Sequence, residues 1–282
     1  MRVEFGCPVA LTEGRRTTLR RHRFIVQFSK LIKKAKLRLL KMHYECNVGH
    51  LGGNLSALDA MLFLHSQIMQ DKDVFVLSKG HSAGALYIVL WAVGKLDEEN
   101  LAMFHKDGTK LAGHPVAGWH KDISFSTGSL GHGVGLAAGC AYAKKLKGEP
   151  GSVFCMTSDG EWEEGSNWEA LMFIAHHRLE NLTLLIDANG LQGFGRTADI
   201  ASLDPLIDKI RGFDITPIEI DGHDPDALNA AFNIESDRPK VIILRTVKGY
   251  GISYMENSME WHYLPMTESQ YIQAMLEIKQ KE

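Results

Sequence analysis

The sequence predicts an α/β fold in which a parallel sheet is flanked by helices on both faces. Apolar runs of strand length alternate with helical patterns along the 282-residue chain, and this alternation is typical of strand–helix–strand units. The apolar runs are almost continuous, which fits strands that are covered on both faces. The five strands that we expect span residues 74–77, 153–157, 182–186, 216–220 and 241–245.

Helical patterns lie between and after these runs. The periodicity predicts helices at residues 56–69, 83–93, 133–146, 167–175, 225–232 and 268–281. Asp224 precedes the fifth of these helices and can serve as its N-cap. A Gly-rich stretch, residues 108–139, has little strand or helix pattern before Gly131. Long loops of this kind in α/β folds usually carry functional residues.

The composition is that of an ordinary soluble globular protein. Hydrophobic residues make up 45%, charged residues 23%, and the formal net charge is −3, so no global electrostatic argument favours nucleic acid binding. No apolar run reaches the roughly 18 to 20 residues that span a bilayer, and the N-terminus lacks a secretory pattern. The four cysteines form no metal-binding spacing. We therefore expect a cytoplasmic protein with no membrane or nucleic acid partner.

The segment from Arg15 to Lys41 is strongly basic, with eleven Lys and Arg residues. Apolar residues fall between them at roughly helical spacing, at positions 24, 28, 31, 35 and 39. This pattern indicates an amphipathic helix with a solvated basic face; the alternative is a surface that docks an acidic partner or a polyanion. We expect a basic helical segment (1–45), a main domain (46–265) and a C-terminal helix (266–282).

Polar residues follow two of the expected strands. Asp159 and Gly160 come just after residues 153–157, and Asn189 comes just after residues 182–186. Asp159 and Asn189 are one strand–helix–strand unit apart, so both should project from the edge where open α/β sheets bind ligands. Their oxygens suit Mg2+, which takes few protein ligands and completes its shell with phosphate oxygens. By themselves, an Asp-Gly turn and a distant Asn also fit an ordinary turn.

These residues resemble the thiamine diphosphate signature, in which Gly-Asp-Gly is followed one strand–helix–strand unit later by an Asn. Ser158 stands where the signature begins with Gly, and a serine there could tighten the turn over the diphosphate. Further motifs are similar to those of transketolases and occur in the family order: GHLGG at 49–53, LSKGH at 77–81, GHP at 113–115, STGSLGHG at 126–133, EWEEGSNWE at 161–169, KGYG at 248–251 and WH at 261–262.

The resemblance implies a thiamine diphosphate-binding fold with a defined set of site residues. A metal ion, Mg2+ or alternatively Ca2+ or Mn2+, would be held by Asp159, Asn189 and the backbone carbonyl of Leu191. Three catalytic histidines would bond sugar oxygens and move protons, namely His50, His114 and His262. The cofactor would contact His81, Gly128, Leu130, Gly160, Glu161, Asn189 and His262.

Other residues keep two interpretations. Glu164 and Glu169 match acidic residues that line a channel between paired active sites in the family, or they are ordinary carboxylates on a helix face. Lys248 lies near the substrate, or it is a surface lysine. His43 and His65 belong to no motif, and we expect them to be structural.

In transketolases, the glutamate that activates the cofactor belongs to a pyrimidine-binding domain, which follows the diphosphate-binding domain. This chain ends a few residues after the helix that would lead to it. The resemblance therefore implies the N-terminal subunit of a split transketolase, with residues 46–265 as the diphosphate-binding domain. A partner chain would supply the pyrimidine and C-terminal domains in an α2β2 heterotetramer. The pair would transfer a two-carbon ketol unit from a ketose (phosphate) to an aldose (phosphate).

Three alternatives stay open. The chain could belong to a transketolase relative that acts on an unusual sugar, since most contacts to the far end of the sugar lie in the missing domain. It could belong to a deoxyxylulose-phosphate synthase, although the motifs at 113–115 and 261–262 favour transketolase. It could also be a non-catalytic thiamine diphosphate-binding subunit, which only Ser158 and the basic N-terminal segment support.

Overall fold

A single five-stranded parallel sheet organises the chain. The computed structural model describes residues 9–280, with side chains from Phe24 onward. The strands lie in the order β1-β2-β3-β7-β6, and all four pairings are parallel. They span Val74–Leu77 (β1), Val153–Ser158 (β2), Leu182–Ala188 (β3), Thr216–Asp221 (β6) and Lys240–Arg245 (β7). The predicted fold class and all five strands are confirmed, with ends that differ by two residues at most.

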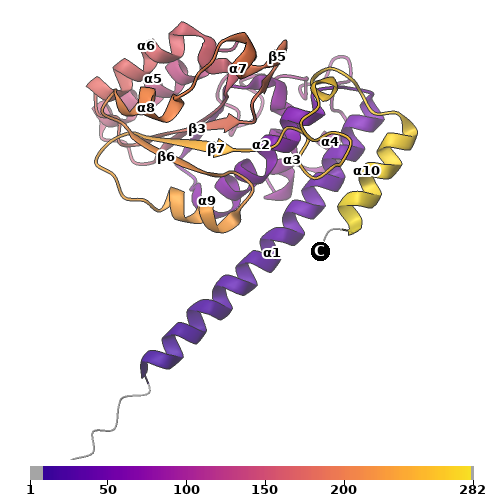
Figure 1. Cartoon of the computed structure of the whole chain (residues 1–282), viewed down its shortest axis with the longest axis horizontal. Coiled ribbons are helices and arrows are strands. Elements are labelled where there is room, and N and C mark those ends of the chain that lie inside the picture. Colours follow the sequence, from indigo (N-terminus) through magenta and orange to yellow (C-terminus); the bar gives the residue numbers. More distant parts are fainter. Residues whose placement is uncertain (1–8, 281–282) are drawn as a thin grey trace, which may run out of the picture.

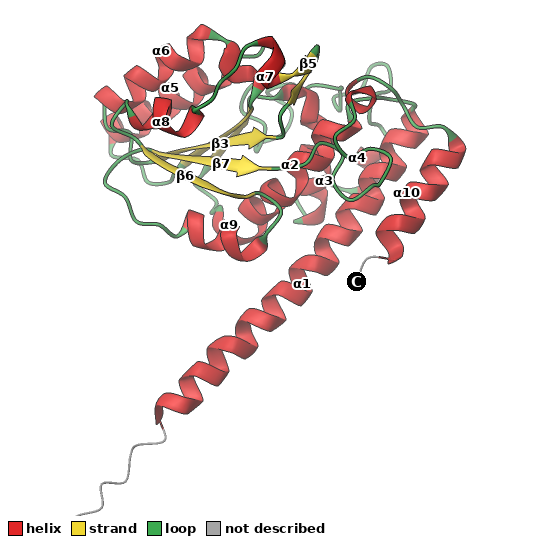
Figure 2. Cartoon of the chain, in the orientation of Figure 1, coloured by secondary structure: helices red, strands yellow, loops and turns green. Residues whose placement is uncertain are grey.

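Helices cover both faces of this sheet, as Figure 2 shows. Successive residues of a strand point to opposite faces. The buried residues of β1, β2, β3 and β7 accordingly divide between two apolar clusters; in β2, Phe154 and Met156 belong to one cluster and Val153 and Cys155 to the other. The first cluster packs under α1 (Val9–Cys46), α2 (Leu51–Phe63), α3 (Ala83–Ala92), α9 (Pro225–Phe232) and α10 (Glu268–Gln280). The second packs under α5 (Gly133–Lys147), α6 (Gly165–His176) and α8 (Leu206–Arg211).

The predicted helix at 56–69 is wrong at both ends. Helix α2 begins at Leu51 and passes at Leu64–Ile68 into a π-helical turn. Gly52 and Gly53 are poor helix formers, but packing decides here: a Cβ on Gly52 would lie 3.0 Å from Lys248, and one on Gly53 would lie 3.5 Å from His81. All thirteen residues of α2 are buried, so tertiary contacts hold the glycines in the helix.

Local sequence patterns correctly predicted a helix with its N-cap and a long loop. Helix α9 has the predicted bounds, and the side chain of Asp224 accepts a hydrogen bond from the N–H of Asp226 at 2.9 Å. Residues 102–132 form a long loop without helix or strand, between α4 (Glu98–Leu101) and α5. No helix within residues 9–280 combines the length and apolar character needed to cross a membrane.

The basic segment forms the long helix α1, which reaches beyond the body of the molecule in Figure 1. The expectation of a solvated basic face holds for Lys30, Lys34 and Lys41, which are exposed, but is wrong for two other basic residues. The Lys36 side chain is 7% exposed and pairs with Asp59 at 3.0 Å. The Arg38 side chain is 10% exposed and pairs with Glu98 at 2.6 Å. The arginines at positions 15–23, which belong to the same predicted basic face, lie outside the part of the chain whose side chains the structure describes.

A buried ion pair joins the elements at the carboxyl edge of the sheet. Lys79, two residues after β1, bonds Asp187 of β3, and both side chains are fully buried. The Lys79 ammonium also donates to the carbonyl of Gly53 at 3.1 Å. Asp187 further accepts hydrogen bonds from Ser56 of α2 at 2.6 Å and from Thr246 just after β7. These bonds connect two strand ends to α2 and to the segment after β7.

Replacing Lys79 with Met should destabilise the fold by about 3–5 kcal/mol, because the Asp187 carboxylate would stay buried without its cation. Urea unfolding followed by circular dichroism gives the free energy of unfolding. The double variant Lys79→Met/Asp187→Asn should lose less than Lys79→Met alone, since it buries no net charge. As a control, Lys147→Met breaks a pair that is 67% and 54% exposed and should change stability by less than about 1 kcal/mol. A similar loss in both lysine variants would contradict the assigned role.

Candidate functional site

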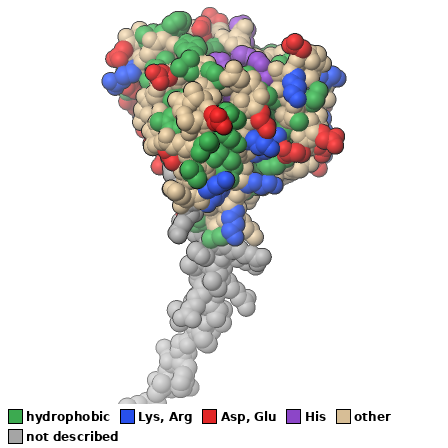
Figure 3. Space-filling view, turned by 90° about the vertical axis from the view of Figure 1, so that its right-hand side faces the viewer, with side chains coloured by type: hydrophobic (Ala, Val, Ile, Leu, Met, Phe, Trp, Pro, Cys, Tyr) green, Lys and Arg blue, Asp and Glu red, His purple; other side chains and the backbone are tan. Residues whose placement is uncertain are grey.

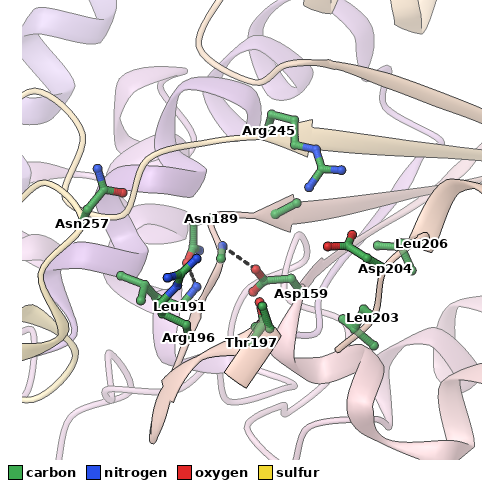
Figure 4. A pocket seen from close by; sticks show the side chains of 13 residues that line it. Asp159, Asn189, Leu191, Arg196, Thr197, Leu203, Asp204, Leu206, Arg245 and Asn257 are labelled. Carbon is green, nitrogen blue, oxygen red and sulfur yellow. Dashed lines mark hydrogen bonds between the residues drawn. The ribbon is translucent and has the colours of Figure 1, made fainter. Parts of the chain in front are cut away.

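The ends of β2 and β3 bring the predicted metal ligands together. The Asp159 carboxylate accepts hydrogen bonds from the N–H groups of Gly160 at 2.8 Å and Gly190 at 2.6 Å. The side chain of Asn189 accepts one from the N–H of Leu191 at 3.1 Å. In Figure 4, Asp159, Asn189 and Leu191 lie at one wall of a cavity of about 490 Å³. Asn189 and Leu191 also line a second cavity of about 450 Å³.

Asp159 is a buried carboxylate that forms no ion pair with the described residues. It is 5% exposed, and among the described residues its hydrogen bonds come from backbone N–H groups alone. Burial, and next the carboxylate of Asp187, raise the pKa of Asp159 to about 6. Asp187 sits beside it with a lowered pKa because, against the effect of its burial, Lys79 neutralises it. A cation at Asp159 would relieve the electrostatic penalty that this pKa reports.

This turn fits a magnesium ion that carries phosphate oxygens. Within the described residues, no three His, Cys, Asp or Glu side chains gather into a metal cage. Mg2+ needs no such cage, because it usually keeps one or two carboxylates and fills its octahedron with water and phosphate. The donors at the turn are one carboxylate, one amide oxygen and a backbone carbonyl, all of them hard oxygen ligands.

Four of the predicted histidines form one cluster. The ring centroid of His50 lies 5.7 Å from that of His81, 6.3 Å from that of His114 and 5.2 Å from that of His262. The rings of His81 and His262 are 5.5 Å apart. These residues come from four separate segments of the chain. Figure 3 looks at the side toward which the strands point, and histidine side chains gather at its upper edge.

The four rings are electrically neutral at physiological pH. Burial is the main cause that lowers the pKa of each of them, and nearby positive or imidazole groups add to it. For His262 the pKa falls to about 3, with Lys248 as the next cause. A neutral ring offers one donor and one acceptor nitrogen. The Nδ1 atom of His50 is buried and has no hydrogen-bond partner among the described residues, so it is available to a ligand.

Gly160 and Ser158 line the cavity of about 450 Å³, and Gly128 lies against the His114 ring of the histidine cluster. A Cβ on Gly160 would lie 2.6 Å from the side chain of Gln192, and one on Gly128 would lie 2.7 Å from the His114 ring. Gly128 also has φ 145°, a backbone conformation that favours glycine. Leu130, His81 and Ser158 line the same cavity. Ser158, the departure from the Gly-Asp-Gly pattern, is the last residue of β2 and is accommodated there.

The side chain of Glu161 turns away from the cavity. Its carboxylate accepts hydrogen bonds from the hydroxyl of Ser78 and from the N–H of Gly131 at 2.9 Å. The residue is fully buried, and it fastens the Gly-rich loop to β1. A contact between Glu161 and the cofactor stays a prediction; such a contact would use the backbone N–H at the start of the turn.

The structure decides between the two interpretations of Lys248 and adds a hairpin that the sequence analysis did not predict. Lys248 is 2% exposed and therefore not a surface lysine; its ammonium lies 3.2 Å from the carbonyl of Leu191 and 3.0 Å from Nδ1 of His262. Burial, and then Lys79, lower the pKa of Lys248 to about 8. A short hairpin, Leu191–Gln192 (β4) with Gly195–Arg196 (β5), covers Gly160. The Gly193-Phe194-Gly195 triplet was the sequence signal for that hairpin.

The remaining candidates are two structural histidines and two exposed glutamates. His43 and His65 are buried structural histidines, as expected, and each ring bonds a carbonyl of its own helix, Leu39 at 3.1 Å and Met61 at 3.0 Å respectively. Glu164 and Glu169 are exposed at the start and on the surface of α6, and their part in a channel stays a prediction.

Comparison with known proteins identifies the family. Residues 31–279 match the family model described as "Transketolase, thiamine diphosphate binding domain". The chain is 36% identical over 226 residues to an apulose-4-phosphate transketolase subunit from Actinobacillus succinogenes, covering 76% of this chain and 82% of that one. It is 35% identical over 246 residues to the 6-deoxy-6-sulfo-D-fructose transketolase subunit SqwG of a Clostridium species, covering 83% and 90%. The chain therefore belongs to the transketolase family, as a thiamine diphosphate-binding N-terminal subunit.

Solved structures agree on the fold. The transketolase from Leishmania mexicana superposes with a TM-score of 0.82 at 24% identity, over 90% of this chain and 42% of that one. The chain thus spans about two fifths of that transketolase, whereas it spans most of the two subunit chains.

Asp159 should make the metal-free fold less stable as the pH rises. Its folded pKa of about 6 lies above the ordinary value of 3.8, so its contribution to stability is complete below about pH 4 and is lost as the pH passes 6. The loss should be about 2–3 kcal/mol at most. Urea titrations in the presence of a chelator, from pH 4 to 7.5, should show Asp159→Asn gaining stability relative to wild type across this range. A constant difference between the two would contradict the assignment.

Proposed function

We propose that this chain holds the diphosphate of thiamine diphosphate through Mg2+, with Asp159, Asn189 and the carbonyl of Leu191 as metal ligands. The observation that carries the proposal is the meeting of this oxygen-rich turn with a cavity that is lined by two histidines of the cluster, His81 and His262. Lys248 adds a buried cation at the same wall, which suits an anionic diphosphate. His81, Gly128, Leu130 and the backbone at Gly160 and Glu161 would complete the contacts to the cofactor; Ca2+ or Mn2+ could replace Mg2+.

The catalytic histidines would act at the oxygens of the sugar. His262 accepts a hydrogen bond from the Lys248 ammonium through Nδ1, because an ammonium group can only donate. Its proton therefore sits on Nε2, which can donate to the cofactor or to a substrate oxygen. His50 keeps an unbonded Nδ1, and His114 is the most exposed of the three at the mouth. As neutral rings they can donate to an oxygen on which charge develops, and accept its proton.

Bound thiamine diphosphate supplies the electron sink for breaking the donor's carbon–carbon bond. The chain's own groups hold it in place, exclude water from the buried turn and stabilise charge on the sugar oxygens. In transketolases, which this chain resembles, the glutamate that activates the cofactor belongs to the pyrimidine domain. We propose that this glutamate comes from a partner chain with the pyrimidine domain, next to residues 46–265. The two chains would form an α2β2 heterotetramer, which the C-terminal helix 266–282 helps to connect.

The reaction would be transfer of a two-carbon ketol unit from a ketose to an aldose. Both subunit relatives are named for sugars with an anionic group, a 4-phosphate in one and a 6-sulfonate in the other. We propose a substrate of this class, a sugar carrying a terminal anion, and we place the groups that bind this anion mainly in the partner chain. A sugar outside ordinary pentose and hexose phosphates is favoured by the same relatives.

Removal of the Asp159 carboxylate should abolish metal-dependent cofactor binding. Calorimetry with thiamine diphosphate and Mg2+, in the presence of the partner chain, should show Asp159→Ala binding at least about 100-fold more weakly than wild type, as loss of a metal ligand requires. Asp237→Ala serves as the control, because Asp237 is exposed and distant from the turn, and it should bind normally. Normal affinity in Asp159→Ala would refute the metal site, and no binding by wild type would favour a non-catalytic scaffold.

Catalysis should need both chains. The purified chain with thiamine diphosphate and Mg2+ should show no ketol transfer, and adding the partner chain should restore it toward anionic ketose donors. Product sugars can be followed by mass spectrometry against a panel of donors and acceptors. Robust transfer by the isolated chain would overturn the split site. Dependence on pyruvate with release of CO2 would instead indicate a deoxyxylulose-phosphate synthase.

A further inference from the structure

A second polar cluster lies further along α2, nine residues after His50. Lys36 of α1 pairs with Asp59 of α2 at 3.0 Å, and Asp59 also bonds Nδ1 of His223 at 3.0 Å. The three side chains are 7%, 3% and 6% exposed. His223 belongs to the loop between β6 and α9, so this buried chain of bonds connects three elements that are distant in the sequence.

The bonds of His223 fix which ring nitrogen carries the proton. The backbone N–H of Val247 donates to Nε2 of His223 at 3.0 Å, so Nε2 is the acceptor. The proton is therefore on Nδ1, where it is donated to the Asp59 carboxylate. His223 also stacks on the ring of Tyr250, with centroids 3.5 Å apart, and the Lys36 ammonium lies 4.4 Å from the same ring. The cluster thus contacts the segment 247–250 at both ends, through the N–H of Val247 and the ring of Tyr250.

This segment carries Lys248 into the candidate cofactor cavity. The N–H of Val247 donates to the His223 ring. The ammonium of the next residue, Lys248, donates to the carbonyl of Leu191 and to His262. Residues 247–250 therefore have the buried cluster on one side and the cavity on the other. A shift of this backbone would move the Lys248 ammonium relative to both the metal-binding turn and a catalytic histidine.

We propose that His223 is a positioning residue for Lys248, held in its tautomer by the Asp59–Lys36 pair. The effect of this positioning on cofactor binding rests on the proposed function. The positioning of Lys248 itself does not depend on it. The cluster also gives the C-terminal part of α1 a role: Lys36 neutralises the carboxylate that orients the ring. The bonds of His223 differ from those of His43 and His65, whose rings bond carbonyls within their own helix.

Two substitutions separate the bonds of the ring. His223→Gln places an oxygen near the position of Nε2, so it can still accept from Val247 while it loses the bond to Asp59. His223→Asn places its amide near Nδ1, so it keeps a donor to Asp59 but leaves the Val247 N–H without its acceptor. Both remove the ring and its stacking on Tyr250. The matched control is His65→Asn, since His65 is equally a buried, hydrogen-bonded histidine but lies far from Lys248.

The first readout is the rate at which an acylating reagent modifies Lys248 in the folded chain without cofactor, followed by mass spectrometry of the Lys248 peptide. Loss of the Val247 bond should raise this rate about tenfold in His223→Asn, whereas His223→Gln should stay within about threefold of wild type. His65→Asn should leave the rate unchanged at matched stability, which thermal unfolding checks. The second readout is calorimetry with thiamine diphosphate and Mg2+ in the complex with the partner chain, where His223→Asn should bind about tenfold more weakly.

The outcomes separate the two proposals. Equal labelling in His223→Asn and His223→Gln, whether raised or not, would overturn the positioning role and leave His223 as a packing residue. An equal rise in His65→Asn would overturn it as well, because general destabilisation would then explain the effect. If wild type binds no thiamine diphosphate, the proposed function fails while the labelling result still decides the positioning of Lys248. Faster labelling in His223→Asn with unchanged cofactor affinity would retain the positioning and overturn its consequence for the cofactor.

Discussion

The buried pair Lys79–Asp187 is the interaction on which the site depends. Two fully buried charges are tolerated only when they neutralise each other and their remaining bonds are satisfied, and here Ser56, Thr246 and the carbonyl of Gly53 satisfy them. The pair fixes α2 and the ends of two strands against one another. It also sets the charge state of its neighbourhood, because Asp187, once neutralised, leaves Asp159 as the carboxylate without a cation. The charge at the proposed metal-binding turn thus depends on a structural ion pair beside it.

The sequence predicted much of this fold because its signals are local. The continuous apolar runs of β2 and β3 are enough to predict that these strands are buried. Asp224 caps α9 by a hydrogen bond to a residue two positions away. The same reasoning failed at α2, where Gly52 and Gly53 weaken the helical pattern and only contacts with Lys248 and His81 explain them. Helix propensity is a weak prior of about 1 kcal/mol per glycine, and packing of a wholly buried helix overrides it.

The site was predicted as a set of residue types but not as an electrostatic arrangement. Asp159, Asn189 and the four histidines stand out because motifs contain them. Lys36 belongs to no motif. Lys248 opens the KGYG motif, but the sequence left it open between a site residue and a surface lysine, because a lysine in a sequence is by default a surface residue. Whether its ammonium is buried depends on partners such as Leu191 and Asp59, which lie 57 and 23 positions away. Long-range pairing of this kind carries no local pattern, so burial of charge was the part that sequence reasoning missed.

The arrangement explains why a metal–diphosphate pair fits better than either ion alone. Among the described residues, Asp159 is a buried anion bonded to neutral N–H groups, and Lys248 is a buried cation bonded to a carbonyl and a neutral ring. Their pKa values move toward neutrality, to about 6 and about 8 respectively. A free metal ion would satisfy Asp159 and repel Lys248, and a free diphosphate would do the reverse. A ligand that brings both charges together satisfies both groups at once, and the family model that matches this chain is described as binding a diphosphate, thiamine diphosphate.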